Sequence, residues 1–192
     1  MKKHVITIAG SLGAGKSSTG RALAKELGYE RFSAGDFQKK AAESLGLALE
    51  EYQRMIEGDP TYDNRADAAL TEAGNKDNVI IDARLGFHFV PHSFKVFLFL
   101  DPHVAAVRML KDAEINPMRH KELIGGMHDV EQVVAGITER TLSEAKRYAK
   151  YYDIQDHMSP RHFDLIINTC TNNLETVTAM ITASYKAWLH EN

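Results

Sequence analysis

The strongest chemical signal in the sequence is a glycine-rich segment with the pattern G-x-x-x-x-G-K-[ST], which runs from Gly10 to Ser17. Its glycines allow successive backbone N–H groups to turn toward phosphate oxygens. Lys16 would bring a positive charge to the β- and γ-phosphates of ATP, and the Ser17 hydroxyl would bind Mg²⁺. The residues predicted to bind the nucleotide are Gly10, Gly13, Ala14, Gly15, Lys16, Ser17 and Ser18. The segment therefore predicts a site for ATP and Mg²⁺.

A phosphate-binding loop indicates nucleotide binding without specifying the reaction. A GTPase would need a guanine-reading motif of the N-K-x-D type, which the sequence lacks, and large motor-type ATPases need a much longer chain. The length of 192 residues, with helices inserted after the second predicted strand, favours a small kinase.

A second group of charged residues follows a helical spacing. Arg140, Glu144 and Arg147 are spaced i, i+4, i+7, so they fall within about 60° of one face of a helix. Two guanidinium groups on either side of a carboxylate could neutralise the charge of a phosphoryl group in transfer, while Glu144 orients them. The alternative is a solvated helix face with an ordinary i,i+4 ion pair.

These residues need a scaffold, and five short apolar runs predict its strands, at 5–9, 29–33, 78–82, 95–100 and 163–168. Helices are predicted at 17–27, 36–46, 48–57, 61–74, 102–111, within 131–152 and at 174–189. Apolar strands that alternate with helices predict an α/β fold of the P-loop NTPase type, a five-stranded parallel sheet covered by helices on both faces. Asp82 ends the third strand, at the sheet edge where ligands bind in such folds. The segment 113–130 has no periodicity and is typical of a lid or mobile loop.

The composition is that of one globular domain, with 44% hydrophobic and 26% charged residues in 192. A net charge of -3 argues against a nucleic-acid partner bound through a broad basic face. No apolar run approaches the roughly 20 residues of a membrane span, and Cys170 is the only cysteine. We expect a cytoplasmic monomer or weak dimer, with a small-molecule substrate and no nucleic-acid or membrane partner.

Six blocks, in their order and spacing, resemble the short, archaeal-type cytidylate kinases of the nucleoside monophosphate kinase superfamily. They are IAGSLGAGKSS (8–18), YERFSAGDFQKKAAESLGLALEEY (29–52), DPTYDNRADAAL (59–70), VIIDARLG (79–86), ERTLSEAKRYAKYYDI (139–154) and FDLIINT (163–169). The resemblance implies transfer of the ATP γ-phosphoryl group to CMP or dCMP. It also implies a helical insertion for the acceptor at about 34–75 and a lid at about 111–135.

The resemblance assigns roles to individual residues. Asp82 resembles the acidic residue that orients Mg²⁺ through water, and Lys16, Arg140 and Arg147 are the catalytic cations. The residues implied at the acceptor are Ser33, Asp36, Lys39, Arg84 and Glu144. A turn or helix-capping role for Asp82 and surface roles for Lys39 and Arg84 are the alternatives.

Recognition of the base is less well specified. Cytosine offers an exocyclic amino donor that a carboxylate accepts, so Asp63 and Asp67 are candidates, with Phe87 and Phe89 as stacking walls. For each of them the alternative is a surface carboxylate or a core phenylalanine.

The sequence also departs from the family. Lys39 stands where the family has an arginine, and lysine lacks the bidentate fork that grips a phosphate. Ala83 replaces the family's glycine in the block 82–85, and the lid segment is longer, with Arg119 as its only arginine. We expect Arg119 to enter the site on closure. Two alternative functions stay open: a kinase for another small metabolite, and a non-catalytic ATP-binding module.

Overall fold

A computed structural model describes residues 3–58, 60–115 and 129–191, and it shows a five-stranded sheet in which every pairing is parallel. The strands are β1 (Val5–Gly10), β2 (Glu30–Ser33), β3 (Val79–Asp82), β4 (Phe94–Phe99) and β5 (Leu165–Asn168), in the order β2-β3-β1-β4-β5. All five predicted strands are confirmed. In the register, Ser33 and Ile8 both lie opposite Asp82, so the carboxyl ends of β1, β2 and β3 meet at one edge.

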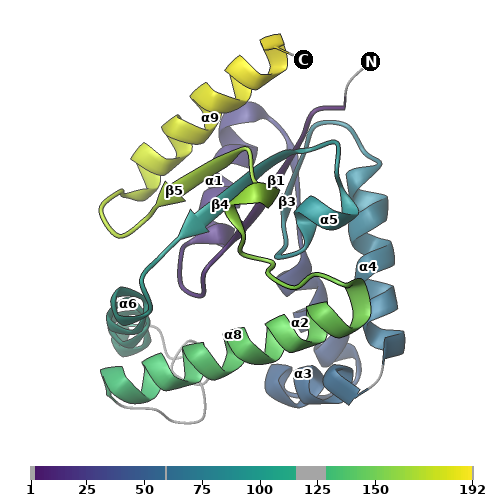
Figure 1. Ribbon diagram of the computed structural model, residues 1–192, viewed down its shortest axis with the longest axis vertical. Coiled ribbons are helices and arrows are strands. Elements are labelled where there is room, and N and C mark those ends of the chain that lie inside the picture. Colours follow the sequence, from purple (N-terminus) through teal and green to yellow (C-terminus); the bar gives the residue numbers. More distant parts are fainter. Residues whose placement is uncertain (1–2, 59, 116–128, 192) are drawn as a thin grey trace.

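Helices connect the strands and cover both faces of the sheet (Figure 1). They are α1 (Lys16–Leu27), α2 (Ala34–Ser44), α3 (Leu49–Gly58), α4 (Pro60–Gly74), α5 (Gly86–Phe89), α6 (Pro102–Ile115), α8 (Val130–Tyr152) and α9 (Leu174–Glu191), with a 3₁₀ turn, η2 (Pro160–His162). Within these ranges, no helix has the length and hydrophobicity needed to cross a membrane.

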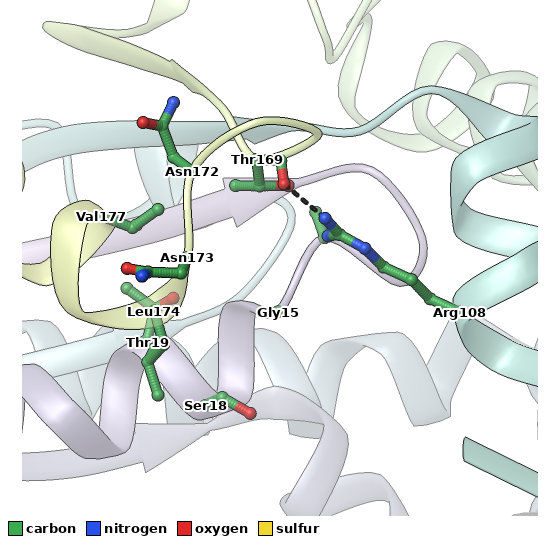
Figure 2. Close-up of a pocket in the computed structure, with 10 residues that line it drawn as sticks. Gly15, Ser18, Thr19, Arg108, Thr169, Asn172, Asn173, Leu174 and Val177 are labelled. Atoms are coloured by element: carbon green, nitrogen blue, oxygen red, sulfur yellow. Dashed lines mark hydrogen bonds between the residues drawn. The ribbon is translucent and has the colours of Figure 1, made fainter. Parts of the chain in front are cut away.

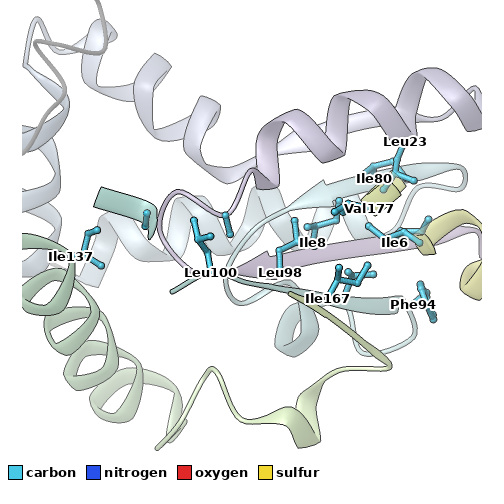
Figure 3. Close-up of a cluster of buried hydrophobic side chains, with 14 of the residues drawn as sticks. Ile6, Ile8, Leu23, Ile80, Phe94, Leu98, Leu100, Ile137, Ile167 and Val177 are labelled. Atoms are coloured by element: carbon cyan, nitrogen blue, oxygen red, sulfur yellow. The ribbon is translucent and has the colours of Figure 1, made fainter. Parts of the chain in front are cut away.

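The strands bury side chains on both faces, as their unbroken apolar runs predict. Along β1, Ile6 and Ile8 face one core, which α1 and α9 cover and which includes Leu23 and Ile181 (Figure 3). Val5, one residue out of phase, belongs to the opposite core with Leu70 of α4. The period of two thus sends successive residues of β1 to two apolar layers on opposite faces of the sheet.

Two elements differ from the prediction. The four-residue α5 was not predicted, because so short a helix shows no 3.6-residue periodicity. The helix predicted at 102–111 extends to Ile115, so the aperiodic segment begins later than its sequence indicates. Of the predicted lid, residues 111–115 continue α6, Asp129 is the N-cap of α8 and 130–135 begin that helix, while 116–128 lie outside the described residues.

Candidate active site

The glycine-rich loop turns from β1 into α1. Gly15 occupies the N-cap of α1 at φ 86°, in the left-handed region that glycine adopts without strain. Lys16 begins the helix, and its Nζ donates hydrogen bonds of 2.9 Å to the carbonyl oxygens of Gly10 and Ser11. The ammonium group of Lys16 therefore lies over the turn of the loop. It is next to the N-terminus of α1, where anions are favoured.

Ser17 and Asp82 lie in direct contact at the carboxyl ends of β1 and β3. The Ser17 hydroxyl donates a 2.6 Å hydrogen bond to Asp82 Oδ2, and Asp82 is 5% exposed. Hydroxyl and carboxylate oxygens are the hard ligands that Mg²⁺ prefers. The pair fits the predicted metal site, with Ser17 as the ligand and Asp82 beside it.

The neighbouring β2–α2 turn brings two predicted acceptor residues to the same edge. Ser33 is buried at the N-cap of α2, where its Oγ accepts a 3.2 Å hydrogen bond from the Asp36 N–H and lies 3.5 Å from Asp82 Oδ2. Asp36, in the first turn of α2, forms an ion pair with Arg31 at 2.8 Å. Lys39 is half-buried one turn further along α2.

Glu144 joins α8 to the sheet through two arginines. Its carboxylate lies 2.7 Å from Arg84 Nε and 3.1 Å from Arg140 Nε, and its side chain is 11% exposed. Burial would raise the pKa of Glu144, but Arg84 and Arg140 outweigh it, so the pKa is lowered and the carboxylate is ionised. Burial likewise opposes the charge of Arg84, yet Glu144 raises the pKa of that arginine.

Helical spacing predicted Arg140 and Arg147 around this carboxylate; Arg140 lies there, and Arg84 is an additional partner that the spacing did not predict. Arg84 lies beside Arg140 there, because it follows the end of β3, a part of the sequence distant from α8. Arg147 lies one turn further along α8, with its guanidinium carbon 5.3 Å from the centre of the Tyr148 ring.

The site carries an excess of positive charge. Burial lowers the pKa of Lys16 to about 7, and Arg84 and Arg140 add to this effect while Asp82 and Glu144 partly offset it. The charges of Lys16, Arg84 and Arg140 thus repel one another, and the carboxylates of Asp82 and Glu144 offset this repulsion only in part. An anionic group would relieve this repulsion, because opposite charge favours the charged form of Lys16.

A pocket of about 240 Å³ adjoins the loop. Its walls come from α1, α6 and the segment after β5, and the residues are Ala14, Gly15, Ser18, Thr19, Arg108, Thr169, Asn172, Asn173, Leu174 and Val177 (Figure 2). Arg108 Nη2 donates hydrogen bonds of 2.8 and 3.2 Å to the carbonyl oxygens of Thr169 and Cys170, which fixes its guanidinium at the pocket wall.

Of these pocket residues, only Ala14, Gly15 and Ser18 were predicted as site residues. Arg108 and the residues after β5 carry no motif of their own. The signal that could have found them is position, since ligands bind beyond the carboxyl ends of parallel strands.

The residues proposed for base recognition lie in different environments. Asp67 Oδ2 accepts a 2.7 Å hydrogen bond from the Tyr152 hydroxyl, so this carboxylate joins α4 to α8. Phe87 is 8% exposed and stacks on His162 with ring centres 4.4 Å apart, which makes it a core residue and not an open stacking wall. Phe89 is half-buried with its ring edge-on to Tyr152. The side chain of Asp63 and all of Arg119 lie outside the described residues.

Comparison with known proteins agrees with this geometry. The model of the cytidylate kinase-like family matches residues 5–171. A cytidylate kinase of Methanosphaera stadtmanae is 33% identical over 92% of this chain and 95% of its own length, and one of Pyrococcus abyssi is 32% identical over 94% and 92%. An S-adenosylmethionine-dependent nucleotide dehydratase of Lacinutrix mariniflava is 28% identical over 96% of this chain, which spans 36% of that longer protein.

Solved structures share the fold at lower identity. A shikimate kinase from Acinetobacter baumannii in complex with shikimate covers 99% of this chain and 95% of its own, with a TM-score of 0.60 and 16% identity. An uncharacterized protein from Eubacterium ventriosum reaches a TM-score of 0.67 at 14% identity, over 96% of this chain and 99% of its own. Likeness at this level shows the fold alone, that of the P-loop kinases. The phosphate-binding loop, the family match and the archaeal relatives agree, and the chain belongs to the cytidylate kinase-like family.

Proposed function

We propose that this protein transfers the γ-phosphoryl group of ATP to CMP or dCMP. The observation that carries the proposal is the cluster in which Lys16, from the loop, faces Arg84 and Arg140, which share Glu144. Cations that reach one point from the loop, from β3 and from α8 can hold a phosphoryl group between donor and acceptor. Phosphoryl transfer needs this kind of positioning and charge neutralisation more than covalent chemistry from the protein.

The donor would lie along the loop, with its nucleoside in the pocket beside Arg108. The guanidinium of Arg108 is held by hydrogen bonds to the Thr169 and Cys170 carbonyls and could stack on a base. Ser17 and Asp82 would hold Mg²⁺, which supplies neutralisation of charge on the β- and γ-phosphates when it is bound.

The acceptor would approach from the α2 side, where Ser33, Asp36 and Lys39 lie near the end of β2. Arg84 would contact its phosphate, and Arg140 would neutralise the group in transfer. Glu144 would act by orienting both arginines. The choice of CMP or dCMP rests on the family and on its archaeal relatives named cytidylate kinase.

A panel of acceptors tests the proposal. With ATP and Mg²⁺, we expect kcat/KM to be highest for CMP or dCMP and much lower for UMP, AMP and GMP. Lys16→Ala, purified in the same way, is the control for contaminating kinases and should be inactive. Turnover only with another metabolite would contradict the choice of acceptor. Tight ATP binding without turnover on any acceptor would favour a non-catalytic module.

A further inference from the structure

Arg31 lies beside the proposed metal site, although the proposed mechanism does not use it. It projects from β2, and its guanidinium joins two carboxylates. Nη1 lies 2.8 Å from Asp36 Oδ2, and Nη2 lies 3.1 Å from Asp82 Oδ2. The two partners differ in environment, because the Asp36 side chain is 52% exposed whereas that of Asp82 is 6% exposed.

Arg31 binds the same oxygen of Asp82 as Ser17 does. Asp82 Oδ2 also accepts the 2.6 Å hydrogen bond from Ser17, the proposed Mg²⁺ ligand. A carboxylate this deeply buried costs several kcal/mol of desolvation unless a cation or hydrogen bonds compensate it. Arg31 supplies that cation from within the chain.

Packing holds Arg31 in this position. A Cβ added at Gly20 of α1 would lie 3.2 Å from Arg31 Nε, so the helix passes directly over the guanidinium. The planar fork of arginine reaches both carboxylates at once, which the single ammonium group of lysine does not do in the same way.

We infer that Arg31 is the counter-ion of Asp82 in the absence of metal and gives this carboxylate up when Mg²⁺ and nucleotide bind. Asp36 then keeps the guanidinium paired at the surface. Arg31 is thus a positioning residue, since it acts through Asp82. The inference rests on the proposed function only in placing Mg²⁺ beside Ser17 and Asp82.

Thermal unfolding of Arg31→Gln with and without metal tests the exchange. In EDTA we expect Tm to fall by on the order of 5–10 °C, because a buried carboxylate loses its partner. With Mg²⁺ and ADP, the difference in Tm between the variant and the wild type should fall to less than half of its value in EDTA. The reason is that the metal then neutralises Asp82 in place of Arg31. A role in packing alone would keep the gap equal in both conditions and would overturn the inference. Arg21→Gln, on the exposed face of α1, is the matched control, and Arg31→Lys carries the same comparison if the glutamine variant does not fold.

A double-mutant cycle in EDTA tests the pair without metal or nucleotide. In an Asp82→Asn background, Arg31→Gln should cost less than half of the Tm loss that it causes in the wild type. Equal losses in the two backgrounds would overturn the counter-ion pair. Failure of Mg²⁺ and ADP to stabilise the wild type would instead overturn the metal site of the proposed function, and the exchange with it.

Discussion

At the scale of single residues, Glu144 is a buried charge that depends on its partners. It is ionised although buried, because Arg84 and Arg140 bind its two oxygens at 2.7 and 3.1 Å. Removing its charge would leave two guanidinium groups close together without a common partner. Their positions relative to Lys16 would then be lost, even though both arginines remain in the chain.

We therefore expect Glu144→Gln to lower kcat by about 10–100-fold, the usual cost of losing a residue that orients active-site groups. KM for ATP should change much less, because the nucleoside pocket is built from other residues. Steady-state kinetics with ATP and CMP measure both constants. Glu139→Gln, an exposed position on the same helix, is the control. A kcat for Glu144→Gln equal to that of the control would show that this carboxylate does not orient the arginines.

His157 makes the stability of the folded protein depend on pH. It is 6% exposed, its ring is edge-on to Tyr148 at 5.0 Å between centres, and burial lowers its pKa below the ordinary value of 6.5. As pH falls through about 6.5, His157 takes up a proton in the unfolded chain, whereas in the folded protein it stays neutral until a lower pH. Stability is fully present above this pH and is lost as pH falls below it.

The free energy of unfolding should thus decline from about pH 6.5 toward pH 5 in the wild type and decline less in His157→Phe. Urea unfolding at several pH values measures the slope. His103→Gln, at an exposed position, should keep the wild-type slope. If His157→Phe also keeps it, another group causes the acid sensitivity.

At the scale of elements, the donor pocket depends on α6 being held against the end of β5. Arg108 makes this connection through the Thr169 and Cys170 carbonyls, as Figure 2 shows for Thr169.

Arg108→Ala should raise KM for ATP by about tenfold with kcat nearly unchanged, the pattern for a group that binds ground state and transition state equally. Arg161→Ala, at an exposed position in η2, is the control. A fall in kcat at constant KM would place Arg108 in the chemical step instead.

Helices α4 and α8 are joined by the 2.7 Å hydrogen bond from Tyr152 to Asp67. Hydrogen bonds to charged groups contribute about 1.5–3 kcal/mol when they are well shielded, and this half-buried one should contribute about 1 kcal/mol. Tyr152→Phe should then lower Tm by about 2–4 °C in a chain of this size. Tyr151→Phe on the same turn of α8 should leave Tm unchanged; an equal loss in both variants would show that the hydrogen bond is not the cause.

At the scale of the whole molecule, the sequence was sufficient to predict the sheet and the loop, because both depend on local patterns. Buried parallel strands such as β1 and β3 show as apolar runs, and the loop has a fixed spacing from Gly10 to Ser17. The α/β fold predicted from these patterns is confirmed, and so is the family that the six sequence blocks resemble. The single-domain organisation, the insertion at about 34–75 and the lid at about 111–135 stay predictions.

What the sequence did not predict depends on residues that only the fold brings together. Arg84 reaches Glu144 across 60 positions of sequence, so helical spacing could not reveal this pair. Arg108 reaches the carbonyls after β5 in the same way, and Arg31 reaches Asp82 across neighbouring strands. Pairs of this kind have no fixed spacing, so no one-dimensional pattern reveals them.

We propose that the cations around Lys16 stabilise the transfer of a phosphoryl group from ATP to a pyrimidine nucleoside monophosphate. The most direct test of this proposal follows the label from [γ-³²P]ATP in the presence of Mg²⁺ and CMP. We expect labelled CDP as the main product, little labelled inorganic phosphate, and neither product with Lys16→Ala. Label released only as phosphate, or CMP left unlabelled while another acceptor is phosphorylated, would contradict it.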